Sequence, residues 1–297
     1  MKLLPSLKQL EYLVALIDTG HFGQAAGKCN VTPSTLSAGI KDLEDILGVA
    51  VAERTKRTVL ITSIGREIAA RARQILVDAE DVVALAASHT SRMSGEIKLG
   101  AIPTISPFVL PRVLPGIEAQ YPDLRIYLRE EQTAPLLSRL RDGDLDLALI
   151  ALPFDTTGLA SSTLYEDEFV FACPASHPLA DRTLIEDRDL LDLPLLLLEE
   201  GHCLRGHALE ACRLQPGRIR VQFEATSLQT LVQMVASGLG VTLLPKMAVS
   251  AGLASIESIR LIPLAVPAFR QIGLVWRASS PRQEDFRTLS QLFTDFR

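Results

Sequence analysis

The sequence predicts an α+β protein of several domains: an N-terminal winged helix-turn-helix, one long helix, and a C-terminal α/β part of two subdomains. Three observations support this prediction. Short helical patterns lead into a β-hairpin pattern in residues 1–62, one apolar stripe at helical spacing runs through residues 63–92, and strands alternate with helices from residue 94. The chain of 297 residues is 47% hydrophobic, which is ample for two or three cores. The expected domains are 1–62, 63–92 and 93–297, the last divided into subdomain I (93–166 and 269–297) and subdomain II (167–268).

Composition places the chain among ordinary cytoplasmic proteins and limits where nucleic acid could bind. No apolar run approaches the roughly 20 residues that cross a membrane, and the N-terminus has no signal-peptide pattern, so no membrane partner is expected. Net charge is −5 overall, but residues 1–62 carry +1 and residues 93–297 carry −6. A DNA-binding module would therefore have to lie at the N-terminal end.

The first 48 residues have the pattern of a helix-turn-helix. Apolar residues from Leu7 to Ile17 repeat at helical spacing and end at Gly20, and a short alanine-rich helix is expected at 22–28. The third helix begins at Thr32 and Pro33, a capping hydroxyl followed by proline at the first helical position. Its buried stripe consists of Leu36, Ile40, Leu43 and Leu47, and Gly48 ends it.

The third helix and the following hairpin carry the predicted DNA contacts. Outward positions of the helix hold short hydroxyl side chains and one lysine, which suit base edges and phosphates. Residues 51–62 read as a β-hairpin wing with cations at its tip, placed for backbone phosphates. A generic three-helix bundle remains an alternative. The predicted DNA-binding residues are Thr32, Pro33, Ser34, Thr35, Ser37, Lys41, Arg54, Lys56 and Arg57.

A helix of nearly 30 residues is expected from Ser63 to about Ser91, and its apolar stripe is too long to be buried by the helix alone. A helix–helix seam between two copies of the chain is the preferred use, with docking against its own domain as the alternative. A dimer would also supply the two reading helices that an operator with two half-sites requires.

From residue 94 the alternation of strands and helices predicts mostly parallel sheets with both faces covered. Ligands of such sheets bind beyond the carboxyl ends of the strands, at helix N-termini. Three hydroxyl-bearing stretches, Thr104-Ile105-Ser106, Gln132-Thr133 and Thr226-Ser227, are expected there and could form a polar pocket for a small ligand or an oxidant. Simple helix capping is the alternative for each. The expected strands are 97–100, 125–129, 145–151, 169–173, 195–198, 221–223, 241–245 and 272–276, with helices at 107–120, 134–142, 227–237 and 283–296.

Residues 199–212 contain two of the four cysteines. Cys203 follows His202 and lies two residues before Arg205, and positive neighbours favour the reactive thiolate form of a cysteine. Cys212 is nine residues further on, which is a rise of roughly 13 Å along a helix. Because a disulfide needs Cα atoms within about 7 Å, joining these cysteines would require a helix at this position to unwind. Such a bond in a reducing cytosol would be transient and redox-sensing.

Two other readings of these cysteines stay open. Both could be buried structural residues. A metal site of His202, Cys203, His207 and Cys212 has suitable residue types, but its spacing matches no common zinc pattern, so no metal is predicted. No cofactor is expected either, because Gly238-Leu239-Gly240 lacks the downstream helix of a dinucleotide fingerprint.

Several motifs resemble those of known proteins. The N-terminal third resembles the LysR-type transcriptional regulators, and within that family the later motifs resemble the OxyR group of hydrogen peroxide sensors. The N-terminal motifs are Ala25-Ala26, Val31-Thr32-Pro33-Ser34-Thr35-Leu36-Ser37, Leu43-Glu44, Leu47-Gly48-Val49, Glu53-Arg54 and Leu60-Ile61-Thr62. The later ones are Gly201-His202-Cys203-Leu204-Arg205 with Cys212, and Ala225-Thr226-Ser227-Leu228-Gln229-Thr230-Leu231. The resemblance covers essentially the whole chain, and the cysteine motif is the narrower one.

The resemblance implies a periplasmic-binding-protein-like regulatory domain and a homodimer assembled into a homotetramer. It implies a transcription activator, not an enzyme, that binds double-stranded promoter DNA, responds to hydrogen peroxide and contacts RNA polymerase. Cys203 matches the peroxide-reactive cysteine and Cys212 its resolving partner, linked through a Cys203 sulfenic acid. The residues implied around the sulfur are Thr104, Thr133, His202 and Arg270.

The chain departs from that pattern in two places, and two other functions remain as alternatives. Gln222 stands where a histidine is usual, and Gly206-His207 replaces the usual Asp-Gln. Gly206 should weaken its helix by roughly 1 kcal/mol relative to alanine. Cys29 and Cys173 are expected to be buried without a redox role. The alternatives are a LysR-type regulator that binds a small organic ligand in its cleft, and a thiol peroxidase.

Overall fold

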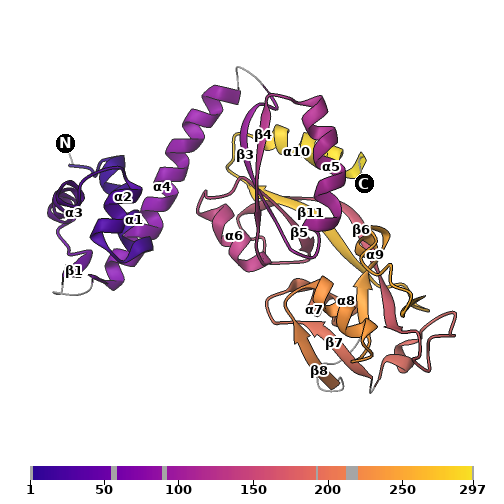
Figure 1. Ribbon diagram of the computed structural model, residues 1–297. Helices are drawn as coiled ribbons and strands as arrows, with labels where there is room; N and C mark the ends of the chain where they lie inside the picture. Colours follow the sequence, from indigo (N-terminus) through magenta and orange to yellow (C-terminus); the bar gives the residue numbers. More distant parts are fainter. Residues whose placement is uncertain (1–2, 55–58, 89–91, 192, 212–219, 296–297) are drawn as a thin grey trace. The chain divides into compact units, whose positions relative to one another are not determined.

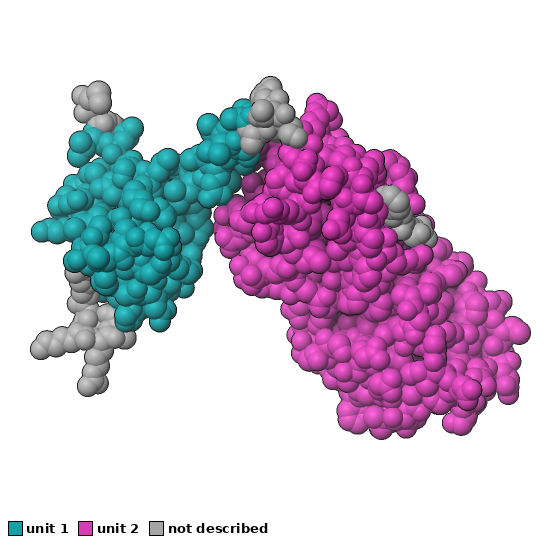
Figure 2. All heavy atoms as spheres, turned by 45° about the horizontal axis from the view of Figure 1, so that its top comes forward, with its two compact units in different colours: residues 1–90 teal, residues 91–297 magenta. Residues whose placement is uncertain are grey.

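The computed structural model describes residues 3–54, 59–88, 92–191, 193–211 and 220–295, and the side chains of 54, 87, 88, 211 and 220–222 are outside this description. The chain forms two compact units, Met1–Thr90 and Ser91–Arg297, shown in two colours in Figure 2. None of the helices in the described ranges is both long and apolar enough to span a membrane.

The first unit begins with three helices whose ends follow from local sequence. Ser6 and Gln9 form a capping box at the start of the first helix, and Gly20 ends that helix in the left-handed region at φ 63°. The Thr32 side chain accepts the N–H of Thr35 at the start of the third helix, which confirms the predicted cap. The three helices are α1 (Leu7–Thr19), α2 (Phe22–Lys28) and α3 (Pro33–Leu47).

Packing of α3 against α1 depends on a small residue that the sequence patterns did not single out. A Cβ atom on Gly39 would lie 2.6 Å from Cδ2 of Tyr12. The missing side chain therefore lets α3 rest on the Tyr12 ring. Leu36, Ile40 and Leu43 of α3 are fully buried beside it, which confirms most of the predicted stripe.

The hairpin and the long helix complete the first unit. Strands β1 (Ala52–Arg54) and β2 (Val59–Ile61) pair antiparallel, as predicted for the wing, while its tip lies outside the described residues. Helix α4 (Ser63–Ser88) packs against α1 through its first half. Val82 and Val83 in its second half are 67% and 71% exposed. The predicted apolar stripe is thus partly used within the unit and partly left uncovered.

The second unit is built on a seven-stranded sheet of order β10-β6-β11-β5-β3-β4, with β9 paired to β6. Helix α6 lies on one side of its parallel part, and α5 and α10 contact each other on the other side (Figure 1). The elements of this part are β3 (Gly95–Ala101), α5 (Ser106–Gln120), β4 (Leu124–Glu130), α6 (Thr133–Arg141), β5 (Leu147–Leu152), β6 (Leu159–Pro174), β11 (Phe269–Arg277) and α10 (Gln283–Asp295).

The remaining elements form the second part of this unit, seen at the lower end of β6 and β11 in Figure 1. Strands β7 and β8 pair in parallel, and a buried apolar cluster separate from that of the first part holds these elements together. The elements are η1 (Asp187–Leu190), β7 (Pro194–Leu198), α7 (Cys203–Ala211), β8 (Arg220–Ala225), α8 (Leu228–Ala236), β9 (Thr242–Pro245), α9 (Lys246–Ser250) and β10 (Ile259–Pro263).

One expectation about this sheet is wrong, and a second is confirmed but incomplete. The sheet is not mostly parallel, because β6, β9, β10 and β11 pair antiparallel. The strand expected at 169–173 is the last third of β6, which begins at Leu159. Both differences arise because β6 and β11 are long strands that pair directly with each other along most of their lengths. Tyr165 and Ile272 contribute to one apolar core, and Phe169 and Ala268 contribute to the other.

Candidate functional site

The predicted reading helix presents a cluster of hydroxyl groups at its N-terminus. The Thr32 hydroxyl lies 2.8 Å from both Ser34 Oγ and Thr35 Oγ1, and all three residues are exposed. Pro33 and Lys41 are exposed as well, and Ser37 is half-buried. Such groups beside a helix N-terminus can donate to phosphate oxygens and base edges. Of the predicted wing cations, Lys56 and Arg57 lie outside the described residues, as does the side chain of Arg54.

Cys203 is the first residue of α7 and a free, half-buried thiol. Its side chain packs against the apolar core of the first part of the unit, whereas Leu204 and Ala208 belong to the core of the second part. Helix α7 therefore bridges the two parts. The sulfur stands at a helix N-terminus, where negative charge is stabilised by the helix dipole.

The chain turns sharply before Cys203 because of a glycine. Gly201 has φ +98°, and a Cβ atom there would collide with Oε1 of Gln132. A residue with a side chain would meet both backbone strain and this contact. Gly201 thus brings the start of α7 against the loop that precedes α6.

A small cavity, too narrow in this structure to admit a water-sized sphere, lies at this junction. It joins three segments that are distant in sequence: the turn after β3, the start of α6 and the start of α7. The predicted residues Thr104, Thr133, His202 and Cys203 all line it. The other lining residues are Ile102, Pro103, Gln132 and Gly201.

The polar groups of the cavity have distinct hydrogen-bonding states. Thr133 is 1% exposed, and its hydroxyl has no hydrogen-bond partner among the described residues. The Thr104 hydroxyl accepts a bond from Nη1 of Arg270 at 3.0 Å. Because a hydroxyl carries a single hydrogen and two lone pairs, the Thr104 hydrogen remains available for another acceptor. The cavity thus offers hydroxyl donors to a small oxygen-containing molecule.

Arg270 lies behind Thr104 and is not among the residues that line the cavity. It is 2% exposed, and its guanidinium also donates to the backbone oxygen of Thr104 at 3.0 Å. Asp167 is its charge partner, with Oδ2 at 3.0 Å from Nε and 2.9 Å from Nη2. One carboxylate oxygen thus contacts two nitrogens of the guanidinium, and such charge-assisted hydrogen bonds restrict the orientation of Arg270.

The two histidines of the cysteine segment are held in the neutral form. Burial lowers the pKa of His202, and Glu199, 3.8 Å away, offsets part of this effect. Burial also lowers the pKa of His207, whose Nε2 lies 3.4 Å from the backbone oxygen of Pro153. His207 therefore links α7 to the end of β5, a contact that the sequence did not indicate.

The other cysteines are placed as follows. Cys29 and Cys173 are buried, and burial raises the pKa of each thiol. Neutral thiols react slowly with oxidants, in keeping with the expectation that they have no redox role. Cys212 lies outside the described residues, as does the side chain of Gln222. Across the described ranges, no three His, Cys, Asp or Glu side chains cluster as metal ligands would.

A wider cleft of about 180 Å³ adjoins the cavity. Thr104 and His202 line both spaces, and Thr226, Ser227 and Gln229 add polar groups to the cleft. Ser227 also caps α8, because its side chain accepts the N–H of Thr230. The third predicted hydroxyl stretch thus serves the cleft and the helix cap, not the small cavity.

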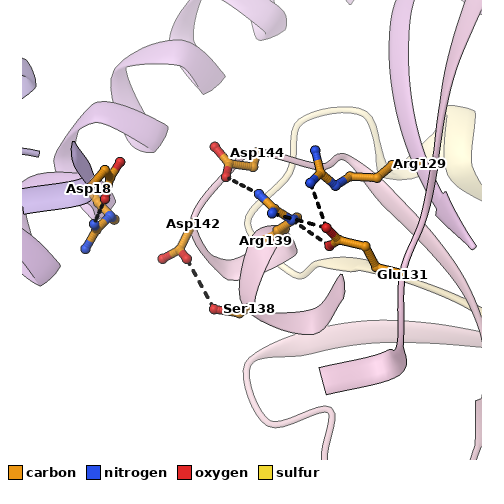
Figure 3. A network of polar contacts seen from close by, with 8 residues as sticks. Asp18, Arg129, Glu131, Ser138, Arg139, Asp142 and Asp144 are labelled. Carbon is orange, nitrogen blue, oxygen red and sulfur yellow. Dashed lines mark hydrogen bonds and ion pairs between the residues drawn. The ribbon is translucent and has the colours of Figure 1, made fainter. Parts of the chain in front are cut away.

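A charge network fixes the loop that carries Thr133. Glu131 binds Arg129 at 2.6 Å and Arg139 at 2.7 Å, and Arg139 also reaches Asp144 at 3.2 Å (Figure 3). Hydrogen bonds from Arg129 and Arg139 lower the pKa of Glu131 to about 2. No motif in the sequence singled out this network, although its arginine, glutamate and second arginine follow an Arg-x-Glu pattern with an arginine eight residues later.

Comparison with known proteins agrees with this architecture. Residues 7–66 match the family described as bacterial regulatory helix-turn-helix protein, lysR family, and residues 90–296 match the LysR substrate binding domain. The chain is 40% identical over 290 residues to the HTH-type transcriptional regulator EstR of Acinetobacter baylyi, covering 96% of this chain and 95% of EstR. It is 38% identical over 287 residues to the DNA-binding transcriptional dual regulator OxyR of Escherichia coli, covering 96% and 94%.

Solved structures give the same result. Full-length OxyR of Pseudomonas aeruginosa with a cysteine-to-aspartate substitution matches with a TM-score of 0.79 and 37% identity over 98% of both chains. A cysteine-to-serine mutant of Corynebacterium glutamicum OxyR with bound H₂O₂ matches with a TM-score of 0.68 and 34% identity, covering 100% of this chain and 94% of that one. The chain therefore belongs to the LysR family of transcription regulators, and its relatives include hydrogen peroxide-responsive regulators of the OxyR type.

Proposed function

We propose that this protein is a hydrogen peroxide sensor that binds promoter DNA and is switched by a reversible disulfide between Cys203 and Cys212. One observation carries the proposal. The thiol of Cys203 lines the same small cavity as two threonine hydroxyls, one of them buried and without a partner among the described residues. Two hydroxyl groups beside a thiol can bind and orient a small molecule with oxygen acceptors, such as hydrogen peroxide.

The oxidation begins at the Cys203 sulfur. The thiolate attacks one peroxide oxygen, an S–O bond forms and the O–O bond breaks, so that the sulfur loses two electrons and peroxide gains them. The departing hydroxide takes up a proton and leaves as water. The hydroxyls of Thr104 and Thr133 can orient the peroxide and donate hydrogen bonds to the departing oxygen.

The second step joins the two cysteines. The Cys212 thiolate attacks the sulfenic acid sulfur of Cys203, an S–S bond forms, and the hydroxyl leaves with a proton as water. Helix α7 begins at Cys203 and continues to Ala211, and nine helical residues rise roughly 13 Å. The bond therefore requires α7 to unwind. A reductant of the thiol class reverses the reaction.

Unwinding of α7 would change contacts across the regulatory unit. Leu204 and Ala208 would leave the core of the second part, and the ion pair of Arg205 with Glu224 would be lost. The contact of His207 with Pro153 would break as well. The disulfide thereby converts a local redox event into a rearrangement between the two parts of the unit.

The assembly and partners belong to the same proposal. The exposed Val82 and Val83 of α4 supply a seam for a homodimer, which would pair into a homotetramer. The hydroxyl cluster of α3 and the wing would bind double-stranded promoter DNA, and the protein would activate RNA polymerase in the cytoplasm. The proposed domains remain 1–62, 63–92 and 93–297.

The test is mass spectrometry of the full-length protein after one equivalent of hydrogen peroxide. A Cys203–Cys212 linked peptide is expected, and Cys203→Ser should abolish it without loss of DNA binding. Cys173→Ala serves as the matched control and should respond like the wild type. Free thiols at both Cys203 and Cys212 after this treatment would refute the sensor mechanism.

The adjoining cleft favours a second candidate function. Its volume of about 180 Å³ and its polar groups Thr226, Ser227 and Gln229 suit a small organic ligand, with the cysteines in a structural role. This candidate predicts a rise in melting temperature with an organic anion and no response to peroxide. A thiol peroxidase would instead consume peroxide continuously when supplied with a thiol reductant, which an assay of peroxide loss decides.

A further inference from the structure

We propose that Asp167 is a positioning residue for the peroxide cavity: it holds Arg270 against Thr104 and thereby directs the Thr104 hydroxyl toward peroxide. This inference rests on the proposed peroxide chemistry of Cys203. Asp167 does not line the cavity, and neither the sequence motifs nor the resemblance to known regulators pointed to it. Its role would be exerted entirely through Arg270.

Both oxygens of the Asp167 carboxylate are occupied. The residue is 4% exposed on β6, and Oδ2 accepts from Nε of Arg270 at 3.0 Å and pairs with Nη2 at 2.9 Å. Oδ1 accepts the backbone N–H of Met247 at 2.9 Å, in the first turn of α9. The carboxylate therefore ties β6, β11 and α9 together around one guanidinium.

The other face of the Arg270 guanidinium is directed at Thr104. Nη1 donates to Oγ1 and Nη2 donates to the backbone oxygen, both at 3.0 Å. Two bonds to one residue restrict both its backbone and its side chain. Because Oγ1 accepts from Arg270, the threonine hydrogen is available to a different acceptor, and Thr104 lines the cavity.

Loss of the Asp167 charge should disturb this arrangement in a defined way. A buried guanidinium without a charge partner is strongly unfavourable, so it would reorient or draw in water. Asparagine offers one acceptor oxygen where Arg270 and the Met247 N–H need two, so one of these bonds would be lost. The Thr104 hydroxyl would then lose its fixed orientation. Peroxide would receive a less well-oriented hydrogen bond during cleavage of the O–O bond.

Glu168 provides a matched control on the same strand. It is the next residue, it carries the same charge, and it binds Nζ of Lys246 at 2.6 Å. It makes no contact with Arg270 among the described interactions. Both carboxylates also line a neighbouring cleft of about 260 Å³, so a general effect of that cleft would appear in both variants.

The experiment compares two reagents at Cys203 in the full-length protein. Peroxide requires the cavity hydroxyls, whereas iodoacetamide alkylates the thiolate without them. The loss of free Cys203 is followed by peptide mass spectrometry with wild type, Asp167→Asn and Glu168→Gln. For Asp167→Asn we expect the peroxide rate to fall at least about tenfold and the iodoacetamide rate to change less than about threefold. Glu168→Gln should change both rates less than about twofold.

A double-mutant cycle tests whether Asp167 acts through Thr104. Thr104→Val removes the hydroxyl, and adding Asp167→Asn to it should lower the peroxide rate less than about twofold further. Full additivity of the two substitutions would overturn the proposal. So would an equal loss of rate with both reagents, which indicates general damage to the fold.

A variant that keeps the charge covers the case in which Asp167→Asn does not fold. Asp167→Glu retains the ion pair but moves the oxygens by one methylene, so the same selective loss of peroxide rate is expected. Equal effects on the two reagents would overturn the inference. If wild-type Cys203 itself fails to react with peroxide, the proposed function falls; if it reacts and both Asp167 variants match it, only the role of Asp167 falls.

Discussion

At the scale of a single residue, the side chain of Thr133 is better explained by ligand binding than by stabilisation of the fold. Its hydroxyl is buried without a partner, an arrangement that normally destabilises a fold by about 1–3 kcal/mol. A ligand that accepts or donates a hydrogen bond there would satisfy the group. The unpaired hydroxyl is therefore consistent with a binding role and not with a capping role.

Thr133→Val should consequently leave the protein as stable as the wild type or slightly more stable, while slowing peroxide oxidation of Cys203. Valine has nearly the same shape and removes only the unpaired hydroxyl. Urea unfolding measures the first effect and the rate of Cys203 oxidation measures the second. A stability loss above about 1 kcal/mol without any change in rate would assign the hydroxyl to the fold.

Glu131, which lies near the cavity, is expected to make the free energy of unfolding depend on pH. Its folded pKa of about 2, lowered from 4.5, means that the ionised, arginine-bound form stabilises the native state. That contribution is complete above the unfolded pKa and is lost as pH falls from about 4.5 toward 2. The shift corresponds to about 3 kcal/mol, which solvent screening at this partly exposed group reduces to 1–2 kcal/mol.

Glu131→Gln should therefore lower the free energy of unfolding by about 1–2 kcal/mol at pH 7, and the difference from wild type should shrink below pH 4.5. Urea unfolding at several pH values measures it. Glu130→Gln, which removes the exposed neighbouring carboxylate, is the control. An equal effect of both variants would show that the Arg129 and Arg139 bonds contribute nothing specific.

At the scale of elements, α7 begins at the proposed peroxide-reactive cysteine and contains a glycine in its second turn. Gly206 lies inside this helix, and a Cβ atom there would meet no heavy atom within 4 Å. Its backbone is also outside the positive-φ region, so alanine fits without strain. No close contact explains why glycine occupies this position. Glycine lowers the stability of the helix, and this favours the unwinding that the proposed disulfide requires.

Gly206→Ala should stabilise α7 by up to about 1 kcal/mol and slow disulfide formation about fivefold, without changing the first reaction with peroxide. The Cys203 sulfenic acid should then accumulate and be trapped by a dimedone reagent. Gly27→Ala in α2, another open helical position, is the control. An unchanged rate of disulfide formation would mean that unwinding of α7 does not limit this step.

At the scale of the whole molecule, the exposed half of α4 is the surface on which assembly is expected to depend. Val83→Asp places a charge on that surface, which should weaken the homodimer because apolar burial across the seam would be lost. Sedimentation velocity should show a shift toward smaller species. Glu80→Gln on the same helix is the control. An unchanged distribution of sedimenting species for Val83→Asp would show that the dimer interface does not include this surface.

DNA binding gives the second prediction at this scale. Arg54→Ala should weaken binding to all DNA sequences alike and lower the slope of log affinity against log salt by about 1, because phosphate contacts carry no sequence information. Titrations at several salt concentrations measure this slope. Arg287→Ala, a surface charge of α10, should leave it unchanged. An effect limited to one base position would instead assign Arg54 to base reading.

Local patterns were sufficient for much of the fold. The caps at Ser6, Thr32 and Ser227 and the stop at Gly20 follow from residues within one turn of each helix. Such signals need no knowledge of distant contacts. The short α9 and β10 and the first ten residues of β6 were missed, because they alternate in polarity or are too brief to show a period.

The sequence by itself determined the family motifs and the type of most elements, and it supplied the prediction that Cys203 reacts with peroxide, since each depends on residues close together in the chain. Only the tertiary structure decided that Thr104, Thr133 and Cys203 line one cavity, and that Arg270 stands behind it on Asp167. In the sequence, Asp167 lies between two other acidic residues, and this pattern is typical of solvent-exposed charges. The pairing of β6 with β11 buries Asp167 against Arg270, and no local pattern predicts where two strands distant in sequence meet.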